Sequence, residues 1–267
     1  EELNILIGSR PFKEDETSDA VKLNLMNILF EKYGIVEADF LSSELCVVPS
    51  IKARDLGFDR SLIAAYGHDD RVCSYPILTA AVEASKKAPE HTLITILADK
   101  EETGSDGVTG MQSNLIMDII AEIATAMGGN AAQVRANSKC LSSDVTAIYD
   151  PNFSEVYDRR NSAYLNHGVG LCKYTGARGK SSSSDANAEY VAEIRRIMDG
   201  ANVAWQTAEL GRVDLGGGGT IACIMANRNI PTVDAGVPVL SMHAPLELVS
   251  KLDCYETMLA CKAIYLA

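Results

Sequence analysis

The feature that most constrains the fold is an alternation of short apolar runs with longer helix-like stretches from residue 62 onward. The apolar runs are Leu62–Tyr66, Thr92–Ala98, Cys140–Ser143 and Thr232–Ala235. One of the apolar runs, Thr92–Ala98, is rich in β-branched residues, as buried parallel strands are. The helix-like stretches are Val72–Lys87, Gln112–Met127, Ala186–Met198, Thr220–Asn227 and a last one beginning near Pro245. This alternation predicts an α/β fold with a mostly parallel sheet covered by helices.

The first sixty-one residues lack this regularity. Leu23–Tyr33 has the pattern of a helix, and Asp39–Val48 looks extended. We therefore predict two parts, residues 1–61 and residues 62–267. The serine run Ser181–Ser184 is expected to be a flexible surface loop.

Charge and hydropathy limit the classes of partner. Asp and Glu number 36 against 24 Lys and Arg, a formal net charge of −12, which repels nucleic-acid phosphates and anionic membranes. The basic residues gather only in pairs such as Arg159-Arg160. No apolar run approaches the roughly 18 to 20 residues that span a bilayer. We expect neither a nucleic acid nor a membrane as a partner.

The cysteines indicate the compartment. There are seven, an odd number, without C-x-x-C spacing, and most lie in apolar stretches. Such cysteines are typical of buried thiols in a reducing environment. We therefore expect a cytoplasmic protein.

Acidic residues follow the apolar runs. Asp69 comes after the first, Glu101 and Glu102 after the second, and Asp144 closes the third. Because ligands bind beyond the carboxyl ends of strands in an open parallel sheet, these side chains are expected to meet at one edge. His243 lies in the loop before the last helix and completes the candidate set.

Carboxylates and an imidazole together are suitable ligands for divalent cations. Zinc accepts both kinds of donor, and one carboxylate can bridge two ions. In the adjacent pair Glu101-Glu102, one residue can bind metal while its neighbour accepts a proton from water. Each residue alone has a commoner role, since an Asp at a strand end is usually a helix cap and a Glu-Glu pair is usually solvated. Only their order and combination favour a metal site.

Other polar or glycine-rich segments are less specific. Gly216–Gly219 lacks the Lys of a phosphate-binding loop, which leaves close backbone packing or a turn that faces the substrate. His68, beside Asp69, either supports the cluster or is exposed.

With these residues in this order, the chain resembles the aspartyl aminopeptidase and yeast-type aminopeptidase I family of two-zinc metalloaminopeptidases. The resemblance covers essentially the whole chain and the C-terminal part of a family member. It rests on ordered motifs: Gly67-His68-Asp69-Asp70-Arg71, Asp99-Lys100-Glu101-Glu102-Thr103-Gly104-Ser105, Ser143-Asp144, Asp214-Leu215-Gly216-Gly217-Gly218-Gly219-Thr220-Ile221 and Met242-His243.

The resemblance implies a role for each candidate residue. Asp69 would bridge two metal ions, and Glu101 would be the general base. Glu102 and Asp144 would bind opposite metals, with His243 as a further ligand. The metals would be two divalent ions, zinc with cobalt or manganese as alternatives. Substrate-binding residues would be Lys173, Gly218 and Gly219.

The same resemblance implies the biological setting. The substrates would be peptides with a free N-terminal amine, and the protein would be a homo-oligomer, a dodecamer by this resemblance. Residues 1–61 would be the remnant of an inserted oligomerisation domain, and residues 62–267 the catalytic domain.

Two departures from the family pattern leave alternatives open. A histidine ligand that the family carries upstream has no counterpart between Glu1 and Asp69. Members selective for acidic N-terminal residues carry a His where this chain has Ala147, so a neutral or broad preference is equally tenable. The alternatives to an aminopeptidase are a related two-metal peptidase or deacylase and a non-catalytic scaffold.

Overall fold

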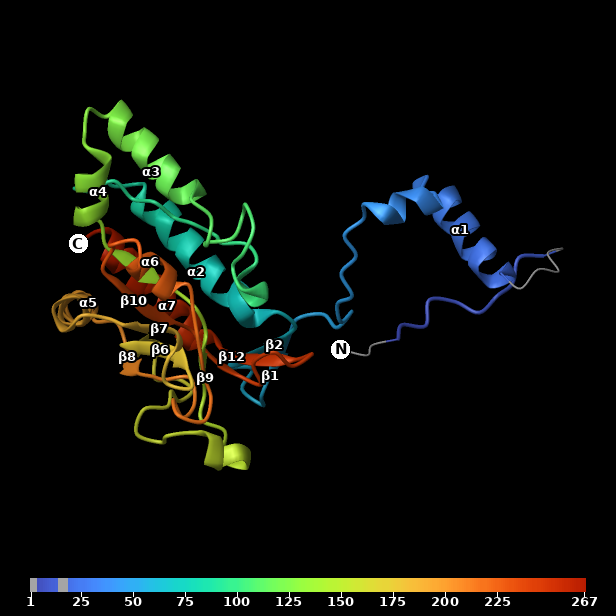
Figure 1. Ribbon diagram of the computed structural model, residues 1–267. Coiled ribbons are helices and arrows are strands. Elements are labelled where there is room, and N and C mark those ends of the chain that lie inside the picture. Colours follow the sequence, from blue (N-terminus) through green and yellow to red (C-terminus); the bar gives the residue numbers. More distant parts are fainter. Residues whose placement is uncertain (1–3, 14–18) are drawn as a thin grey trace. The chain divides into compact units, whose positions relative to one another are not determined.

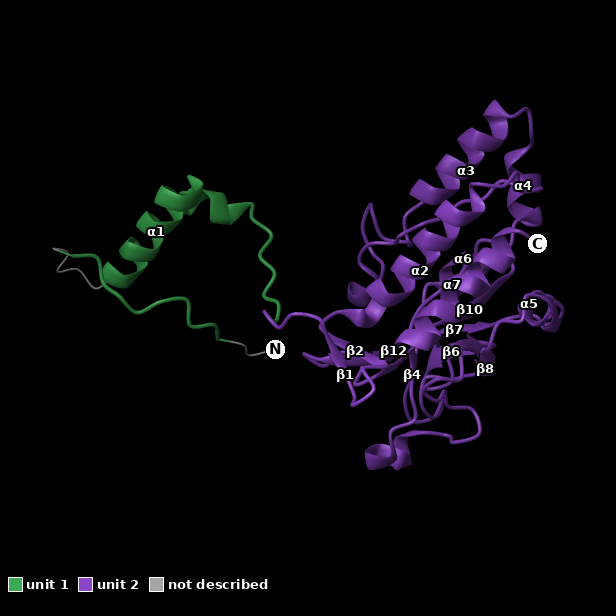
Figure 2. Ribbon diagram, turned by 180° about the vertical axis from the view of Figure 1, so that it is seen from behind, with its two compact units in different colours: residues 1–49 green, residues 50–267 purple. Residues whose placement is uncertain are grey.

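The computed structural model describes residues 4–13 and 19–267. These residues form two compact units, residues 1–49 and residues 50–267 (Figure 2), and each is treated by itself below.

In the described residues of unit 1 there is one α-helix, α1 (Ala20–Tyr33), which includes the predicted helix Leu23–Tyr33. The helix ends at Gly34, whose φ of 71° is a conformation that glycine adopts without strain. The segment predicted as extended instead starts with a 3-10 helix, η1 (Glu37–Leu41). Unit 1 ends before residue 61, and its assignment to an inserted domain stays a prediction.

Unit 2 holds the other elements, most of which are labelled in Figure 1. Its helices are α2 (His68–Ala84), η2 (Glu101–Thr103), α3 (Leu115–Ala126), α4 (Ala131–Asn137), η3 (Pro151–Val156), α5 (Ala188–Gly200), α6 (Ala222–Ala226) and α7 (Lys251–Tyr265). Its strands are β1 (Arg54–Leu56), β2 (Leu62–Ala65), β3 (Cys140–Ser142), β4 (Thr146–Ala147), β5 (Val169–Cys172), β6 (Tyr174–Ala177), β7 (Ser181–Asp185), β8 (Trp205–Thr207), β9 (Gly217–Gly218), β10 (Thr232–Gly236), β11 (Pro238–Leu240) and β12 (Glu247–Ser250).

The strands form three sheets, in the orders β1-β2-β12-β11-β4, β3-β10-β5-β8 and β7-β6-β9. The pairs β3–β10, β4–β11 and β5–β8 are parallel, and the other six pairs are antiparallel. The α/β class is therefore confirmed, but the expected predominance of parallel pairing is wrong. Short connections such as that between β11 and β12 reverse the chain directly, and a reversal of this kind produces antiparallel neighbours.

Three element predictions need correction. Thr92–Ala98 has no regular secondary structure, and the ribbon of Figure 1 has no arrow there. No strand of the described chain pairs with it, although its composition is that of a strand. The serine run expected as a loop is β7, because it pairs with β6. The last helix begins at Lys251, after β12, so the turn at Pro245 precedes a strand.

Two of the four apolar clusters in unit 2 pack helices against strands. The larger lies between α5, α7 and the sheet of β5 and β10, and includes the buried side chains Ile194, Met198 and Val233. The second packs α2 against β11 and β12 through residues such as Cys73 and Val239. Burial of such side chains stabilises the fold by about 1.5–3 kcal/mol each. This packing fixes the strand ends at which the acidic residues lie.

Helix length also bears on membrane association. Among the described residues no single helix is long and apolar enough to cross a membrane, and the one pair that meets the criterion jointly, α3 with α4, is bent by 114°.

Candidate metal centre

Asp69 occupies the junction between β2 and α2. Gly67 there has a φ of 71°, which turns the chain from the strand into the helix. Asp69 itself has a non-helical ψ of 110°, so its side chain departs from the helical path. That side chain is only 6% exposed. The turn therefore places a buried carboxylate at the end of β2, as the sequence predicts.

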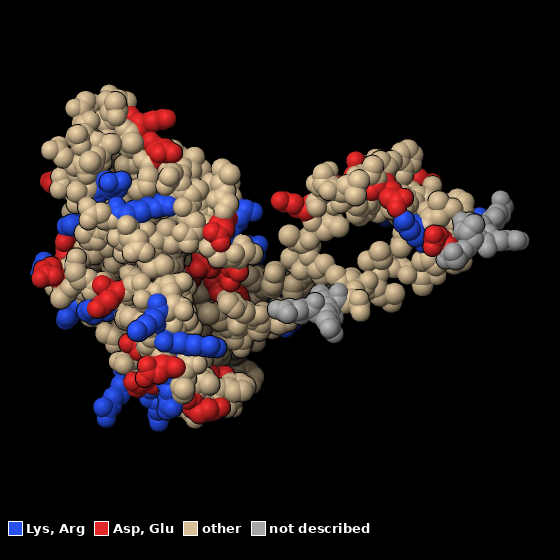
Figure 3. Space-filling model, in the orientation of Figure 1, with Lys and Arg blue, Asp and Glu red and all other residues tan. Residues whose placement is uncertain are grey.

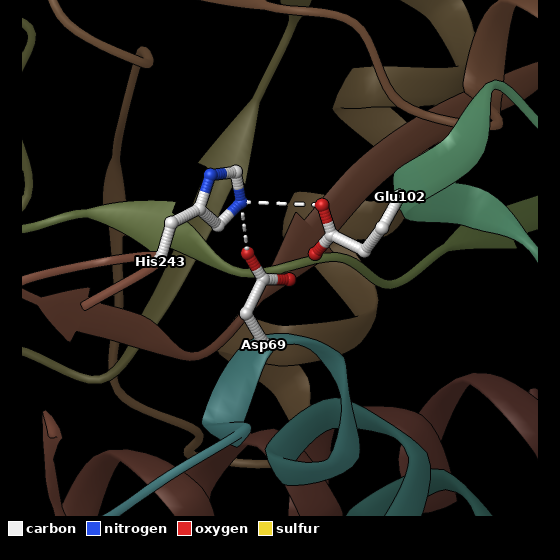
Figure 4. Close-up of side chains that lie close together, drawn as sticks. All are labelled: Asp69, Glu102 and His243. Atoms are coloured by element: carbon white, nitrogen blue, oxygen red, sulfur yellow. Dashed lines mark ion pairs between the residues drawn. The ribbon is translucent and has the colours of Figure 1, made fainter. Parts of the chain in front are cut away.

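His243 and Glu102 reach this carboxylate from two other segments (Figure 4). The His243 Nε2 atom lies 2.8 Å from Asp69 Oδ2 and 3.3 Å from Glu102 Oε2. Glu102 belongs to η2, and His243 follows β11. Ligand atoms of the three side chains all lie within 4.8 Å of one another. Three residues separated by up to 174 positions therefore meet at one point.

A second group of possible ligands also includes Asp69. Asp69, Asp70 and Asp144 also have ligand atoms within 4.8 Å of one another. Asp144 lies between β3 and β4, where its carbonyl oxygen packs against Gly236. A Cβ at residue 236 would lie 2.0 Å from that oxygen, so only glycine permits the approach. Asp69 is shared by both groups.

The carboxyl groups strongly perturb one another. Burial and the charge of Asp70 raise the pKa of Asp69 to about 7, and burial together with Asp144 raises the pKa of Asp70 to about 9. Burial also raises the pKa of Asp144 well above its usual range. Without a cation, ionisation of all these carboxyls costs free energy, because negative charges would be buried close together. A bound divalent ion offsets that cost, so this arrangement favours a cation.

Glu101 lies beside the cluster with a different environment. Burial first, and then the charge of Glu102, raise the pKa of Glu101 above its usual range. Its charge in turn raises the pKa of Asp144, and the charge of His243 acts on Glu101, so Glu101 interacts electrostatically with a member of each group. A carboxylate with a raised pKa is a better proton acceptor near neutral pH.

Three acidic residues of the site are missing from the sequence prediction. The sequence analysis includes Asp70 only in the motif Gly67–Arg71, and in the structure Asp70 belongs to the second ligand group. Asp234 is 2% exposed in the middle of β10. An acidic residue inside a buried strand is a sequence feature that could have indicated a functional role for it. Glu247, also 2% exposed, accepts hydrogen bonds from the backbone N–H groups of Asp69 and His243. The sequence analysis misses Glu247 because it expects a helix from near Pro245, where the structure has β12.

The predicted substrate-binding residues lie apart from these contacts. In the described residues, Lys173 forms an ion pair with Asp185 and no ion pair with the acidic groups. Gly218 lies in β9 opposite Gly176 of β6, and a Cβ at Gly219 would lie 2.5 Å from the Ser182 Cβ. A Cβ at Gly218 would lie 3.0 Å from the Leu210 side chain, so neighbouring residues pack closely against both glycines. The substrate-binding role of Lys173, Gly218 and Gly219 stays a prediction. His68 is buried and its Nε2 lies 3.3 Å from the carbonyl oxygen of Ile63.

The donor set fits divalent cations. Carboxylate oxygens and an imidazole nitrogen are the ligands that zinc takes in catalytic sites. One oxygen of Asp234 and the hydroxyls of Ser142 and Ser143 are buried without a hydrogen-bond partner in the described chain. Unsatisfied buried acceptors beside a cluster of carboxyls are what a bound cation and its surrounding ligands satisfy.

Comparison with known proteins supports this interpretation. The family model described as aminopeptidase I zinc metalloprotease (M18) matches residues 2–265. A probable M18 family aminopeptidase 1 of Clostridium acetobutylicum is 53% identical over 96% of this chain and 56% of its own length. The crystal structure of aminopeptidase I from that organism superposes with a TM-score of 0.90 at 52% identity, covering 98% of this chain and 57% of that one.

Two further structures extend the comparison. An M18 aminopeptidase of Thermotoga maritima has a TM-score of 0.92 at 43% identity, covering 97% of this chain and 58% of that one. The S. cerevisiae mApe1 dodecamer has a TM-score of 0.73 at 23% identity, covering 91% of this chain and 54% of that one, and shows a shared fold alone.

The chain thus spans less than three-fifths of the length of curated relatives from the M18 family. The matched span, residues 2–265, includes every residue of the two ligand groups. The chain belongs to the M18 family, the aminopeptidase I zinc metalloproteases.

Proposed function

We propose that the protein is a metal-dependent aminopeptidase that removes the N-terminal residue of peptides. The observation that carries this proposal is Asp69, a buried carboxylate shared by two groups of ligand side chains. A shared carboxylate is how one residue bridges two cations in two-metal hydrolases. Membership of a zinc metalloprotease family supports the same chemistry.

The proposed ligands divide between the two groups. Glu102 and His243 would hold one ion with Asp69, and Asp144 would hold the other with Asp69 and Asp70. Divalent ions bound there supply positive charge that polarises a peptide carbonyl and makes water more acidic. We propose two ions and zinc as the native metal, with cobalt and manganese as alternatives.

Glu101 is the proposed general base. It carries no ion pair in the described chain, and its raised pKa keeps its carboxylate ready to accept a proton from water at near-neutral pH. Its neighbour Glu102 binds metal in this proposal, so the base and a ligand are held by the same 3-10 turn.

The proposed ions, more than the surface charge, favour a substrate with a free amine. Over the face of unit 2 drawn in Figure 3, acidic side chains are interspersed with basic ones, so the surface as a whole does not select a charged substrate. A divalent ion held by either ligand group can bind the lone pair of a free N-terminal amine, whereas an N-acylated nitrogen is a poor metal ligand. We therefore propose an exopeptidase substrate, with either an acidic or a neutral N-terminal residue.

Oligomeric state and location are proposals as well. We propose a homo-oligomer, as the family resemblance implies. All seven cysteines are free thiols, which is compatible with the cytoplasmic location that we propose.

The test is a hydrolysis assay with free-amine and N-acetylated aminoacyl 4-nitroanilides, with aspartyl and leucyl side chains, in the presence of zinc, cobalt or manganese. We expect cleavage of the free-amine substrates alone. Glu101→Gln should retain metal and lose several orders of magnitude in kcat, because the group that accepts the proton is gone. The exposed Glu122 provides the control, and Glu122→Gln should match the unsubstituted protein.

Two outcomes would reject the proposal. Equal cleavage of N-acetylated substrates would favour a deacylase or another two-metal peptidase. Absence of bound metal together with absence of hydrolysis would favour a scaffold.

A further inference from the structure

Glu247 is a buried carboxylate without a cationic partner. It is 2% exposed and no Lys, Arg or His forms an ion pair with it in the described chain. Its two oxygens instead accept hydrogen bonds from two backbone N–H groups. Oε1 lies 2.7 Å from the His243 nitrogen, and Oε2 lies 3.1 Å from the Asp69 nitrogen. Burying a carboxylate is costly, so a position that retains one calls for an explanation.

The two amides belong to residues whose side chains also meet. His243 Nε2 lies 2.8 Å from Asp69 Oδ2. Glu247 therefore connects the backbones of two residues that share a proposed metal ion, and the contacts close a ring through both side chains. These two residues are 174 positions apart in the chain, and Glu247 is hydrogen-bonded to both of them.

Glu247 is itself held rigidly. It is the first residue of β12, and it lies opposite Ala65 in the ladder between β12 and β2. The chain then runs from Ala65 through Gly67 to Asp69. Because the Glu247 backbone is fixed in β12, its carboxylate can set the distance between the turn at Asp69 and the loop at His243.

The backbone of His243 needs such support. Its φ of 64° lies in the left-handed region, which is unfavourable for a residue with a side chain. The loop around it, Ser241–Leu246, has no regular structure, and Ser241 also has a positive φ of 60°. A charge-assisted hydrogen bond to the His243 N–H stabilises this conformation.

We propose that Glu247 is a positioning residue that sets the separation of Asp69 and His243 and thereby the affinity of the site for a divalent cation. The inference rests on the proposed metal site and adds a residue that binds no metal. Residues that orient metal ligands in this way typically affect metal affinity about 10–100-fold when they are replaced.

Unit 2 contains a matched control for a purely structural role. Asp253 is also fully buried, and its carboxylate accepts hydrogen bonds from the N–H groups of Asn166 at 2.9 Å and Gly168 at 2.8 Å. None of these three residues belongs to either ligand group. Asp253→Asn should therefore lower stability without changing the affinity for zinc.

The experiment measures the dissociation constant for zinc by calorimetric titration and the urea midpoint in EDTA for the same variants. Glu247→Gln keeps the size of the side chain and removes one acceptor and the charge. Glu247→Asp keeps the charge and shortens the reach. We expect zinc affinity to fall about 10–100-fold in both variants and to stay within about twofold of the unsubstituted chain in Asp253→Asn.

The outcomes separate the possible explanations. A loss in Glu247→Gln with full affinity in Glu247→Asp would show that the charge of Glu247 attracts the cation, and it would overturn the positioning role. Unchanged affinity in both Glu247 variants would overturn it too, leaving the metal site intact. No zinc binding by the unsubstituted chain would refute the metal site itself and this inference with it.

Discussion

Replacing Asp70 with asparagine should stabilise the metal-free chain. Burial and Asp144 raise the pKa of the Asp70 carboxyl from 3.8 to about 9. Because the pKa of Asp70 is raised in the folded state, its carboxyl lowers the free energy of unfolding very little below pH 3.8. That free energy then falls as the pH rises from 3.8 toward about 9. At pH 7.5 the folded state then holds a proton that the unfolded chain releases, and this costs about 5 kcal/mol.

The neutral amide removes this cost while keeping the local contacts. An oxygen of the Asp70 side chain accepts from the Val145 N–H at 3.3 Å, and the asparagine carbonyl can do the same. The amide NH₂ can donate to Asp144, the neighbour that most raises the Asp70 pKa after burial. Asp69 and Asp144 still repel each other, so we expect about half of the full value, roughly 2–3 kcal/mol.

Urea unfolding in EDTA measures the effect. At pH 7.5 the midpoint of Asp70→Asn should exceed that of the unsubstituted chain by the equivalent of about 2–3 kcal/mol, and at pH 5 the gain should fall below about 1 kcal/mol. Asp118 is exposed on α3, and Asp118→Asn should have little effect at either pH. A gain that is absent at pH 7.5, or equal at both pH values, would refute the electrostatic reasoning.

Three further predictions follow from other parts of unit 2. His243→Ala should weaken zinc retention by at least about tenfold on dialysis, since one imidazole ligand is lost; unchanged metal content would remove His243 from the ligand set. Ile194→Ala should cost about 2–5 kcal/mol in urea, because Ile194 is 1% exposed in the larger core; the exposed Ile119 is the control. Amides of residues 92–98 should exchange with solvent far faster than those of β10, and slow exchange would show that they are paired.

The regular elements were predictable where one local pattern decided them. The runs at residues 62–66, 140–143 and 232–235 are strands, and α2, α3, α5 and α6 lie where helical stretches were expected. Strand direction was not predictable, because it depends on partners far along the chain. β12 pairs with β2 across roughly 180 positions, and nothing near residue 247 signals that pairing.

The site was predictable in part for a related reason. Asp69 and Asp144 follow strands and His243 lies in a loop, as the rule about strand ends expects, whereas Glu102 lies in η2 after a segment that is not a strand. Asp234 and Glu247 lie inside strands, where a charge normally argues against burial. Their roles depend on the atoms that surround them, and those are fixed only when the chain has folded.

The proposed metal centre would also account for the packing around its candidate ligands. Because their pKa values are raised, ionisation of Asp69, Asp70 and Asp144 disfavours the metal-free fold. A bound cation would reverse the sign of this interaction and stabilise the ionised form. The apolar core of α2, β11 and β12 contributes free energy that opposes the repulsion between these carboxyls. Loss of that packing should therefore loosen the candidate ligand groups even when every ligand residue is unchanged.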